Sequence, residues 1–202
     1  MYNLPYFKAH NQQEVTDFMH AHPFVMLIAR GDVFPVATQV PVLIEERDGK
    51  MMLRAHIMRK TDHYNALVKD GNVLVVFTGA HTYVSASWYQ NKQLASTWNY
   101  SAVHAQGKLN FTNDEDLLDL LTKLTDKFEN NPDSPSLVKH LGDAYIQPLL
   151  KAIVAFEIEI TSIEHVFKLS QNHTKENQAS IKEHLNNGDA DAKAIADAMK
   201  GN

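Results

Sequence analysis

The fold of this chain is decided by residues 24–57, FVMLIARGDVFPVATQVPVLIEERDGKMMLRAHI. This stretch contains three apolar runs, and residues that favour tight turns separate them. Runs of this length predict strands, and their short connections predict antiparallel pairing between neighbours. The chain therefore opens with an antiparallel meander of three strands. The predicted strands are Phe24–Ala29, Phe34–Ile44 and Met51–Ile57, with turns at Arg30-Gly31-Asp32 and Asp48-Gly49.

Two further strands are predicted later in the chain. Asn72–Thr78 is a β-branched run of the kind found in a sheet interior, and Gly79 marks its exit. Ala155–Phe167 alternates apolar with polar residues, which is the period of a strand that is solvated on one face. The sheet is therefore expected to receive a strand from far along the chain.

Helices are predicted at capping residues and where apolar side chains recur every three or four positions. Because they are insertions between strands and not regular crossovers, the pattern favours an antiparallel barrel with helical decorations over a doubly wound sheet. We predict a mainly β domain over residues 1–172 and a C-terminal helical tail over 173–202. The predicted helices are 11–20, 62–69, a long helix starting at Thr112-Asn113-Asp114, one or two short helices within 137–150 broken near Pro148, 175–185 and 190–199.

Composition places the chain among ordinary soluble proteins, with 44% hydrophobic and 21% charged residues. The net charge of -5 gives nucleic-acid binding no support, although a local basic patch is compatible with it. Cysteine is absent, which excludes disulfides and cysteine metal sites and suits a reducing cytoplasm. No apolar run approaches the roughly 18 to 20 residues of a membrane span. We therefore expect a cytoplasmic protein.

Residues 81–107 mix aromatic and polar side chains more densely than the rest of the chain, and both tryptophans lie there. Buried hydroxyls and amides need partners, so a core strand has little use for this mixture. A pocket for a flat ligand with polar edges needs it, because aromatic faces hold the ring and polar groups orient it. A wet aromatic interface between subunits, or an ordinary loop over the core, is the alternative.

A second cluster, residues 56–61, lies where the third predicted strand gives way to a helix. This cluster can bind a phosphate through the side chains of His56, Arg59, Lys60 and Thr61. The sequence has neither a G-x-G-x-x-G nor a P-loop motif, so any phosphate must be held by side chains. The alternative is a solvated basic turn with Asp62 as a plain N-cap.

Metal and hydrolytic sites find little support. None of the 11 histidines falls in an H-E-x-x-H pattern, so we predict no metal site, although His56, His81 or His104 could serve as a haem ligand. Hydroxyls and imidazoles are present without a G-x-S-x-G elbow, which makes Ser-His catalysis a weak hypothesis. Residues 167–172, FKLSQN, either complete a polar pocket edge or simply end the late strand.

Three segments together resemble the PaiB-type FMN-binding negative transcriptional regulators. The opening Met1-Tyr2, the strand entry at His22-Pro23-Phe24 and the strand at Phe156-Glu157-Ile158 also fit that family. The resemblance extends to about Asn172, and only the helical tail lies outside it. The three segments are GAHTYVSASWY (79–89), STWNY (96–100) followed by Val103-His104, and FKLSQN (167–172).

The resemblance implies a split β-barrel related to the pyridoxamine-phosphate-oxidase-like flavin binders, a homodimer, and an FMN site at the subunit interface. The strand-end cluster would hold the phosphate, and the aromatic segments would line the ring and the ribityl chain. Where the family pattern leads us to expect proline, the chain has Ala80, Ala86 and Ser96, which predicts a freer loop backbone. The implied cofactor residues are His56, Arg59, Lys60, Thr61, Ser87, Trp88, Thr97, Trp98, Asn99, Lys168, Ser170 and Gln171.

The function that this resemblance implies is that of an FMN-binding, flavin-dependent or flavin-sensing negative regulator of transcription. One alternative is a flavin- or haem-dependent oxidoreductase with a small-molecule substrate. Another is a DNA-binding regulator that needs no flavin, although the sequence shows no clear recognition helix flanked by basic residues.

Overall fold

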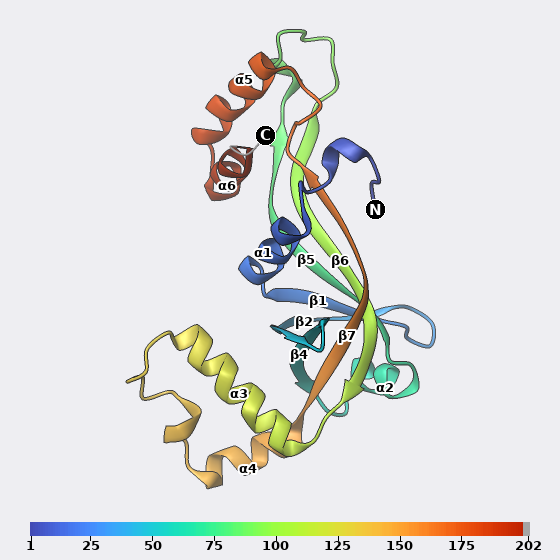
Figure 1. Cartoon of the computed structure of the whole chain (residues 1–202), viewed down its shortest axis with the longest axis vertical. Coiled ribbons are helices and arrows are strands. Elements are labelled where there is room, and N and C mark those ends of the chain that lie inside the picture. The colour runs from blue at the N-terminus through green and yellow to red at the C-terminus, as the bar shows by residue number, and fades with distance from the viewer. Residues whose placement is uncertain (200–202) are drawn as a thin grey trace. The chain divides into compact units, whose positions relative to one another are not determined.

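The computed structural model describes residues 1–199, whose strands form one seven-stranded sheet with helices around it (Figure 1). The strands are β1 (Phe24–Ala29), β2 (Val36–Pro41), β3 (Leu43–Arg47), β4 (Lys50–Met58), β5 (Asn72–Val84), β6 (Thr97–Phe111) and β7 (Ile153–Lys168). The helices are α1 (Gln12–Ala21), α2 (Asp62–Lys69), α3 (Asp114–Glu129), α4 (Asp143–Ala152), α5 (Lys175–Asn186) and α6 (Ala190–Ala198). Three short 3-10 helices are η1 (Pro5–Phe7), η2 (Ala86–Trp88) and η3 (Val138–His140).

The start of the sheet is two hairpins and not the predicted meander. β1 forms where predicted, but the predicted strand over residues 34–44 is divided at Val42 into β2 and β3. Pro41 has no N–H to donate to a strand ladder, and the N–H of Val42 donates to the carbonyl of Pro23 at 2.8 Å. β2 pairs antiparallel with β1 and β3 with β4, and the sheet order is β2-β1-β5-β6-β7-β4-β3.

One long strand, β5, extends past its predicted end, and another, β6, was not predicted from the sequence. Gly79 lies inside β5, so the predicted exit at this residue is wrong. A Cβ at this position would lie 2.9 Å from the ring of Phe18 in α1. The glycine therefore permits close approach of α1 to the strand. β6 begins at Thr97, within the segment where polar side chains hid the strand pattern.

The helices follow their capping residues closely. The side chain of Asn11 accepts from Glu14 at the start of α1, and Asn113 accepts from Asp116 at the start of α3. The predicted break near Pro148 is wrong, since α4 runs through this proline. Proline removes its own N–H bond, but Leu150 in the following turn is buried in an apolar cluster that holds the helix in place.

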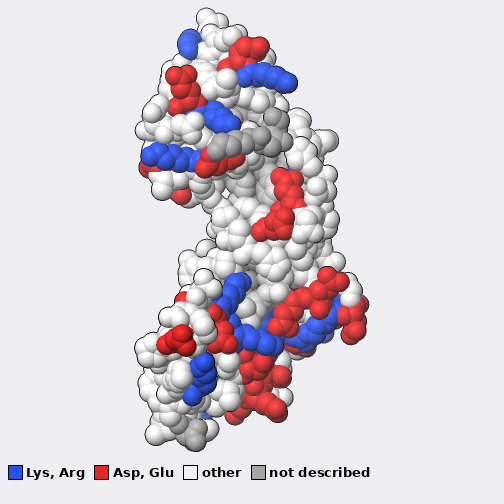
Figure 2. Space-filling view, turned by 60° about the vertical axis from the view of Figure 1, so that its left-hand side comes forward, with Lys and Arg blue, Asp and Glu red and all other residues white. Residues whose placement is uncertain are grey.

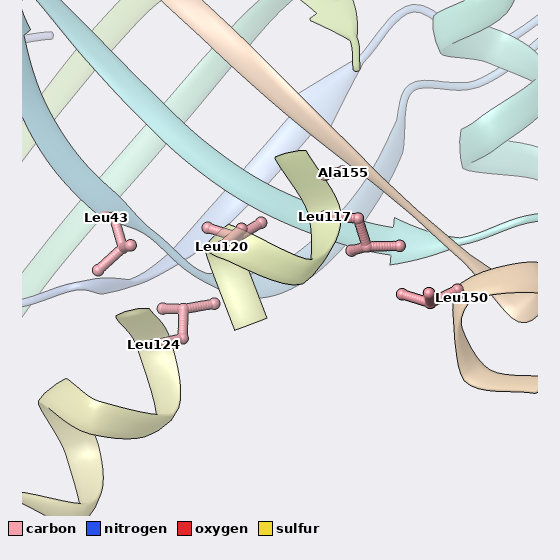
Figure 3. Close-up of a cluster of buried hydrophobic side chains, with 6 residues drawn as sticks. All are labelled: Leu43, Leu117, Leu120, Leu124, Leu150 and Ala155. Atoms are coloured by element: carbon pink, nitrogen blue, oxygen red, sulfur yellow. The ribbon is translucent and has the colours of Figure 1, made fainter. Parts of the chain in front are cut away.

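The chain forms two compact units, and β5, β6 and β7 contribute residues to both. Unit 1 comprises residues 1–22, 77–104 and 164 onward, and unit 2 comprises residues 23–76 and 105–163. The core of unit 2 includes a cluster of buried side chains in which α3 supplies one face (Figure 3). The cluster consists of Leu43, Leu117, Leu120, Leu124, Leu150 and Ala155.

Unit 1 contains α5 and α6, which pack side by side and confirm the two helices predicted in the tail (Figure 1). Ile181 and Leu185 of α5 and Ile195 of α6 are buried. The predicted domain boundary at Asn172 stays a prediction, and residues 200–202 of the predicted tail lie outside the described residues. Within the described chain, no helix combines the length and the apolar character that crossing a membrane requires.

Candidate functional site

The predicted cofactor residues fall into two sets, one in each unit. We call His56, Arg59, Lys60 and Thr61 the phosphate set, and it lies in unit 2. The remaining residues form the aromatic set of unit 1. The members of each set therefore lie within one unit. The aromatic set comprises Ser87, Trp88, Thr97, Trp98, Asn99, Lys168, Ser170 and Gln171.

Arg59 is anchored at one side of its guanidinium group and open at the other. Its Nε donates to the carbonyl of Ile153 at 3.0 Å, and its backbone N–H donates to the carbonyl of Ala152 at 2.9 Å. One terminal nitrogen lies 3.9 Å from an oxygen of the exposed Asp114. The guanidinium group is therefore held at the end of β4 with N–H groups left to donate to an anion.

Thr61 is occupied by the fold. Its hydroxyl donates to the carbonyl of Met58 at 3.2 Å and accepts from the N–H of Tyr64 at 3.1 Å, so it caps α2. An oxygen of Asp62 accepts from the N–H of His63 in the same turn at 2.8 Å. The side chains of Thr61 and Asp62 therefore make their hydrogen bonds at the N-terminus of α2. The hydrogen-bond donors that remain in the phosphate set are those of His56, Arg59 and Lys60.

His56 and Lys60 are the other two members that can meet a ligand. The Nδ1 atom of His56 is buried without a hydrogen-bond partner among the described residues, and burial lowers the pKa of the imidazole. Lys60 is exposed and has a φ of 61°, a backbone conformation that residues other than glycine adopt rarely. A buried ring nitrogen without a partner, followed along the chain by two cationic side chains, suits a group rich in acceptor oxygens, such as a phosphate.

Within the aromatic set, Trp98 lines a pocket of about 300 Å³ on β5 and β6, and the other members of the set do not line it. Trp98 stands at this pocket with 52% of its surface exposed. The ring of His81 lies 6.0 Å from the indole, and the ring of Tyr83 meets it edge-on at 6.0 Å. An open indole with polar neighbours suits a flat ring with polar edges. The pocket is lined by Thr78, Gly79, His81, Trp98, Tyr100, Ser101 and Ala102.

Lys168, at the end of β7, ties down the beginning of β6. Its ammonium group donates to the hydroxyl of Thr97 and to the carbonyl of Trp98, the latter at 3.0 Å. Burial lowers the pKa of this lysine. Its nitrogen also lies 5.9 Å from the ring of Phe7. Lys168 thereby fixes the backbone that carries the exposed indole.

Asn99, Ser170 and Gln171 hold the turn after β7 from within. Asn99 is completely buried, and its amide donates to the hydroxyl of Ser170 at 2.9 Å. Ser170 has a φ of 64°, and Gln171 braces the same turn by accepting from the N–H of Leu169 at 2.7 Å. Because Asn99 follows Trp98 directly in β6, these hydrogen bonds help to fix the position of Trp98 at the pocket. Direct contact between them and a ligand stays a prediction.

The turn that carries Ser87 and Trp88 has a restraint that the sequence did not reveal. The N–H of Ala86 donates to the hydroxyl of Ser96 at 2.9 Å. Both positions are ones where the resemblance led us to expect proline, and two prolines could not form this bond. The loop is therefore fixed by a hydrogen bond and not by proline rings.

Sequence reasoning missed a ring contact between the aromatic segment and the tail. Tyr89 is almost completely buried against the ring of His173 at 4.6 Å, and its hydroxyl has no partner among the described residues. Burial, followed by the neighbouring Tyr83, raises the pKa of Tyr89. Tyr89 lay within the aromatic segment, but no signal pointed to His173 in the tail. Across residues 1–199 there is also no group of three or more His, Cys, Asp and Glu side chains that could hold a metal ion.

Comparisons with known proteins place this geometry in context. A family model described as "Putative FMN-binding domain" matches residues 1–162. The Bacillus subtilis (strain 168) protein "Protease synthase and sporulation protein PAI 2" is 31% identical over 201 residues, covering 99% of this chain and 97% of that protein.

Solved structures with similar folds include the FAD and heme binding protein from Mycobacterium smegmatis, with a TM-score of 0.59 and 18% identity over 85% of this chain and 78% of that one. The flavocytochrome Anf3 from Azotobacter vinelandii has a TM-score of 0.58 and 14% identity over 85% of this chain and 74% of that one. At these identities the likeness concerns the fold alone. It confirms the predicted fold class, a mainly β split barrel with helical insertions.

Proposed function

The chain belongs to the FMN-binding domain family, with FMN as its cofactor, and on this premise we propose a cytoplasmic, homodimeric FMN-binding protein that acts as a flavin-sensing negative regulator of transcription. The observation that carries the proposal is the exposed indole of Trp98 in a pocket with His81 and Tyr100. An aromatic face of this kind holds a flat ring, while neighbouring polar groups orient its edges.

We assign the FMN phosphate to the phosphate set and the ring and ribityl chain to the aromatic set. Arg59 and Lys60 would neutralise the phosphate, and the unpartnered ring nitrogen of His56 would gain a partner. When bound, FMN supplies the redox chemistry, and the protein binds and orients it. A site shared by two copies of the chain does not require the two sets to meet within one copy.

Exposed apolar side chains in unit 2 support the homodimer. β1 buries Val25 and Leu27, yet its alternate residue Phe24 is 64% exposed, and in the connection to β2 Phe34 is 78% exposed. Phe24 pairs with Pro41 at one end of the hairpin and Phe34 lies in the connection at its other end, so these are two separate apolar side chains that a second copy of the chain would cover. Sedimentation at micromolar protein is expected to report twice the chain mass, and a clean monomer that binds FMN tightly would contradict the shared site.

The regulatory part of the proposal rests on the family resemblance. Lys and Arg residues lie among Asp and Glu on the visible face of each unit, without a broad basic area there (Figure 2). We therefore expect any DNA binding to be weak and strongly dependent on salt. Tight, sequence-specific binding by the flavin-free protein at physiological salt, seen in a mobility-shift titration, would favour the regulator that needs no flavin.

A flavin- or haem-dependent oxidoreductase is the second candidate. Two of the proteins with a similar fold are described as binding FAD and heme and as a flavocytochrome. His81 of unit 1 lines the pocket. His104 follows on β6 outside the lining, and burial lowers its pKa, which favours a neutral imidazole. A neutral imidazole is the form that ligates haem iron.

The absorption spectrum of protein purified without added cofactor separates these candidates. Flavin bands near those of free FMN support the proposal, whereas an intense haem band supports the second candidate. Colourless protein is then titrated with FMN, following the quenching of flavin fluorescence. Failure to bind FMN in this titration would contradict the proposed function.

A further inference from the structure

Helix α5 lies beside the connection between β5 and β6 and makes polar contacts with it (Figure 1). We call residues 85–96 the Trp88 loop. The N–H of Gln90 in this loop donates to the side-chain oxygen of Asn177 at 2.9 Å. The hydroxyl of Ser180 donates to the carbonyl of Trp88 at 2.7 Å. Two backbone groups of the loop are therefore satisfied by side chains of one helix.

A ring contact adds to these hydrogen bonds. The imidazole of His184 stacks on the indole of Trp88, with 4.8 Å between centroids and 16° between planes. Its Nδ1 lies 2.8 Å from the carbonyl of Ser180, and since a carbonyl can only accept, this nitrogen carries the proton. The hydrogen bond fixes the imidazole in the orientation in which it covers the indole.

The three side chains form a stripe along α5. Asn177, Ser180 and His184 are spaced three and four residues apart, which brings them to one side of a helix. The neighbouring stripe, Ile181 and Leu185, is buried and holds the helix in unit 1. The apolar stripe thus anchors α5, and the polar stripe is free to hold the loop.

We propose that Asn177, Ser180 and His184 are positioning residues of the flavin site, which hold the Trp88 loop in the conformation that receives FMN. This inference rests on the proposed function, and it extends the site into the tail, beyond the residues that the family model matches. The tail reaches the aromatic set a second time at Asn99, whose amide lies 4.0 Å from the sulfur of Met199.

The test uses point variants of the full chain, because deleting the tail would also remove the buried Ile181 and Leu185. Asn177→Ala withdraws the acceptor from the N–H of Gln90. Asn186→Ala is the matched control, since this exposed asparagine lies on the opposite side of the same helix. Hydrogen exchange of residues 86–92 is measured without flavin, and FMN affinity is measured by fluorescence titration.

Asn177→Ala is expected to speed exchange in the Trp88 loop and to weaken FMN, each by about three- to tenfold, as follows from losing one hydrogen bond. Asn186→Ala is expected to change neither. His184→Ala is expected to act like Asn177→Ala on FMN affinity, and His184→Phe, which keeps a ring over Trp88, is expected to restore it. A change in thermal stability alone would indicate a merely structural role and overturn the inference.

The two measurements separate failure of this inference from failure of the proposed function. Unchanged exchange in Asn177→Ala would overturn the role of α5 whether or not the protein binds flavin. Faster exchange with unchanged FMN affinity would show that the loop does not serve the cofactor, and would also overturn it. If the wild-type protein binds no FMN, the proposed function is contradicted. Hydrogen exchange in the Asn177→Ala variant would still decide whether α5 holds the Trp88 loop.

Discussion

One buried cluster of unit 2 and one of unit 1 are built from different kinds of side chain. Unit 2 packs leucines of α3 into an apolar cluster (Figure 3), and it also buries Arg54 in ion pairs with Glu45 and Asp119. Unit 1 buries the polar pair Asn99 and Ser170, which are hydrogen-bonded to each other. At the α3 cluster the stability of the fold therefore depends on apolar volume, whereas at the Asn99–Ser170 pair of unit 1 it depends on matched polar groups.

This difference indicates which residues remain available for a ligand. In unit 2 Arg59 and Lys60 are not needed to fill the core, so they can serve an anion. In unit 1 the side chains of Asn99 and Ser170 are already paired inside the protein. The pocket there keeps only its surface-facing groups for a ligand, above all the indole of Trp98.

The largest effect is expected for Leu117→Ala in unit 2. Leu117 is completely buried in the α3 cluster, so its truncation should lower the free energy of unfolding by about 2 to 5 kcal/mol. Leu118→Ala, at a partly exposed position on the same helix, should cost much less. Urea denaturation measures both. Similar losses for the two variants would show that the cluster is not what stabilises unit 2.

The second-largest effect is expected for Arg59→Ala, which tests whether this residue of unit 2 binds the FMN phosphate. A charge-assisted contact to a partly desolvated phosphate is worth about 1.5 to 3 kcal/mol, so FMN should bind roughly ten- to hundredfold more weakly. Riboflavin, which lacks the phosphate, should lose little. Arg30→Ala is a matched control in the same unit. Equal losses for FMN and riboflavin would make the role of Arg59 structural, and no loss for either would make the cluster a solvated turn.

Asn99→Ala tests the buried polar pair of unit 1. The variant leaves the hydroxyl of Ser170 without its amide partner, which should cost about 1 to 3 kcal/mol of unfolding free energy. Asn110→Ala, at an exposed position of the same strand, serves as the control. Urea denaturation should separate the two variants clearly. If Asn99→Ala is as stable as the control, the pair contributes no stability and the contrast between the units fails.

The smallest effect is expected from pH and concerns His165 in unit 1. Its Nε2 accepts the N–H of Ala9 at 2.9 Å, which requires the neutral ring. Burial, followed by the charge of Lys8, lowers the pKa of His165 below its ordinary 6.5, while Glu14 opposes them. The unfolded chain therefore binds a proton first, so this stability is complete above pH 6.5 and decreases as the pH falls toward the lowered pKa.

His165→Gln should reduce this pH dependence, because an amide oxygen can accept from Ala9 at any pH. Thermal unfolding between pH 5 and 8 measures the slope for both proteins. If stability changes with pH in the same way in both proteins, His165 does not contribute to the pH dependence. The loss of stability at low pH would then come from other histidines with a lowered pKa, such as His22 and His173.

Elements whose signals are local could be predicted from sequence. Asn11 and Asn113 cap α1 and α3 as expected, and the run that forms β1 has the predicted ends. These elements depend on neighbours within a few positions, so the sequence pattern carries the necessary information.

The features that could not be predicted from the sequence depend on contacts between residues far apart in the chain. Thr97 and Asn99 make β6 look like a polar loop until Lys168 and Ser170, 71 positions further on, supply their hydrogen bonds. The division at Val42 likewise depends on a carbonyl of the preceding connection. For the site, composition pointed to the segment that contains Trp98, which lines a pocket, and its role toward a ligand stays a prediction. Nothing in the sequence paired His184 with Trp88.

The position of β7 in the sheet affects how the nascent chain folds during its synthesis. β7 lies between β6 and β4 and ends at Lys168, so the ribosome has made most of the protein before this strand exists. Until then the facing sides of β4 and β6 carry unpaired backbone groups, which are templates for pairing with other chains. Pairing over so long a sequence separation is also slow. The emerging polypeptide is therefore most prone to aggregate during the synthesis of residues 112–152, the interval in which chaperones would matter most.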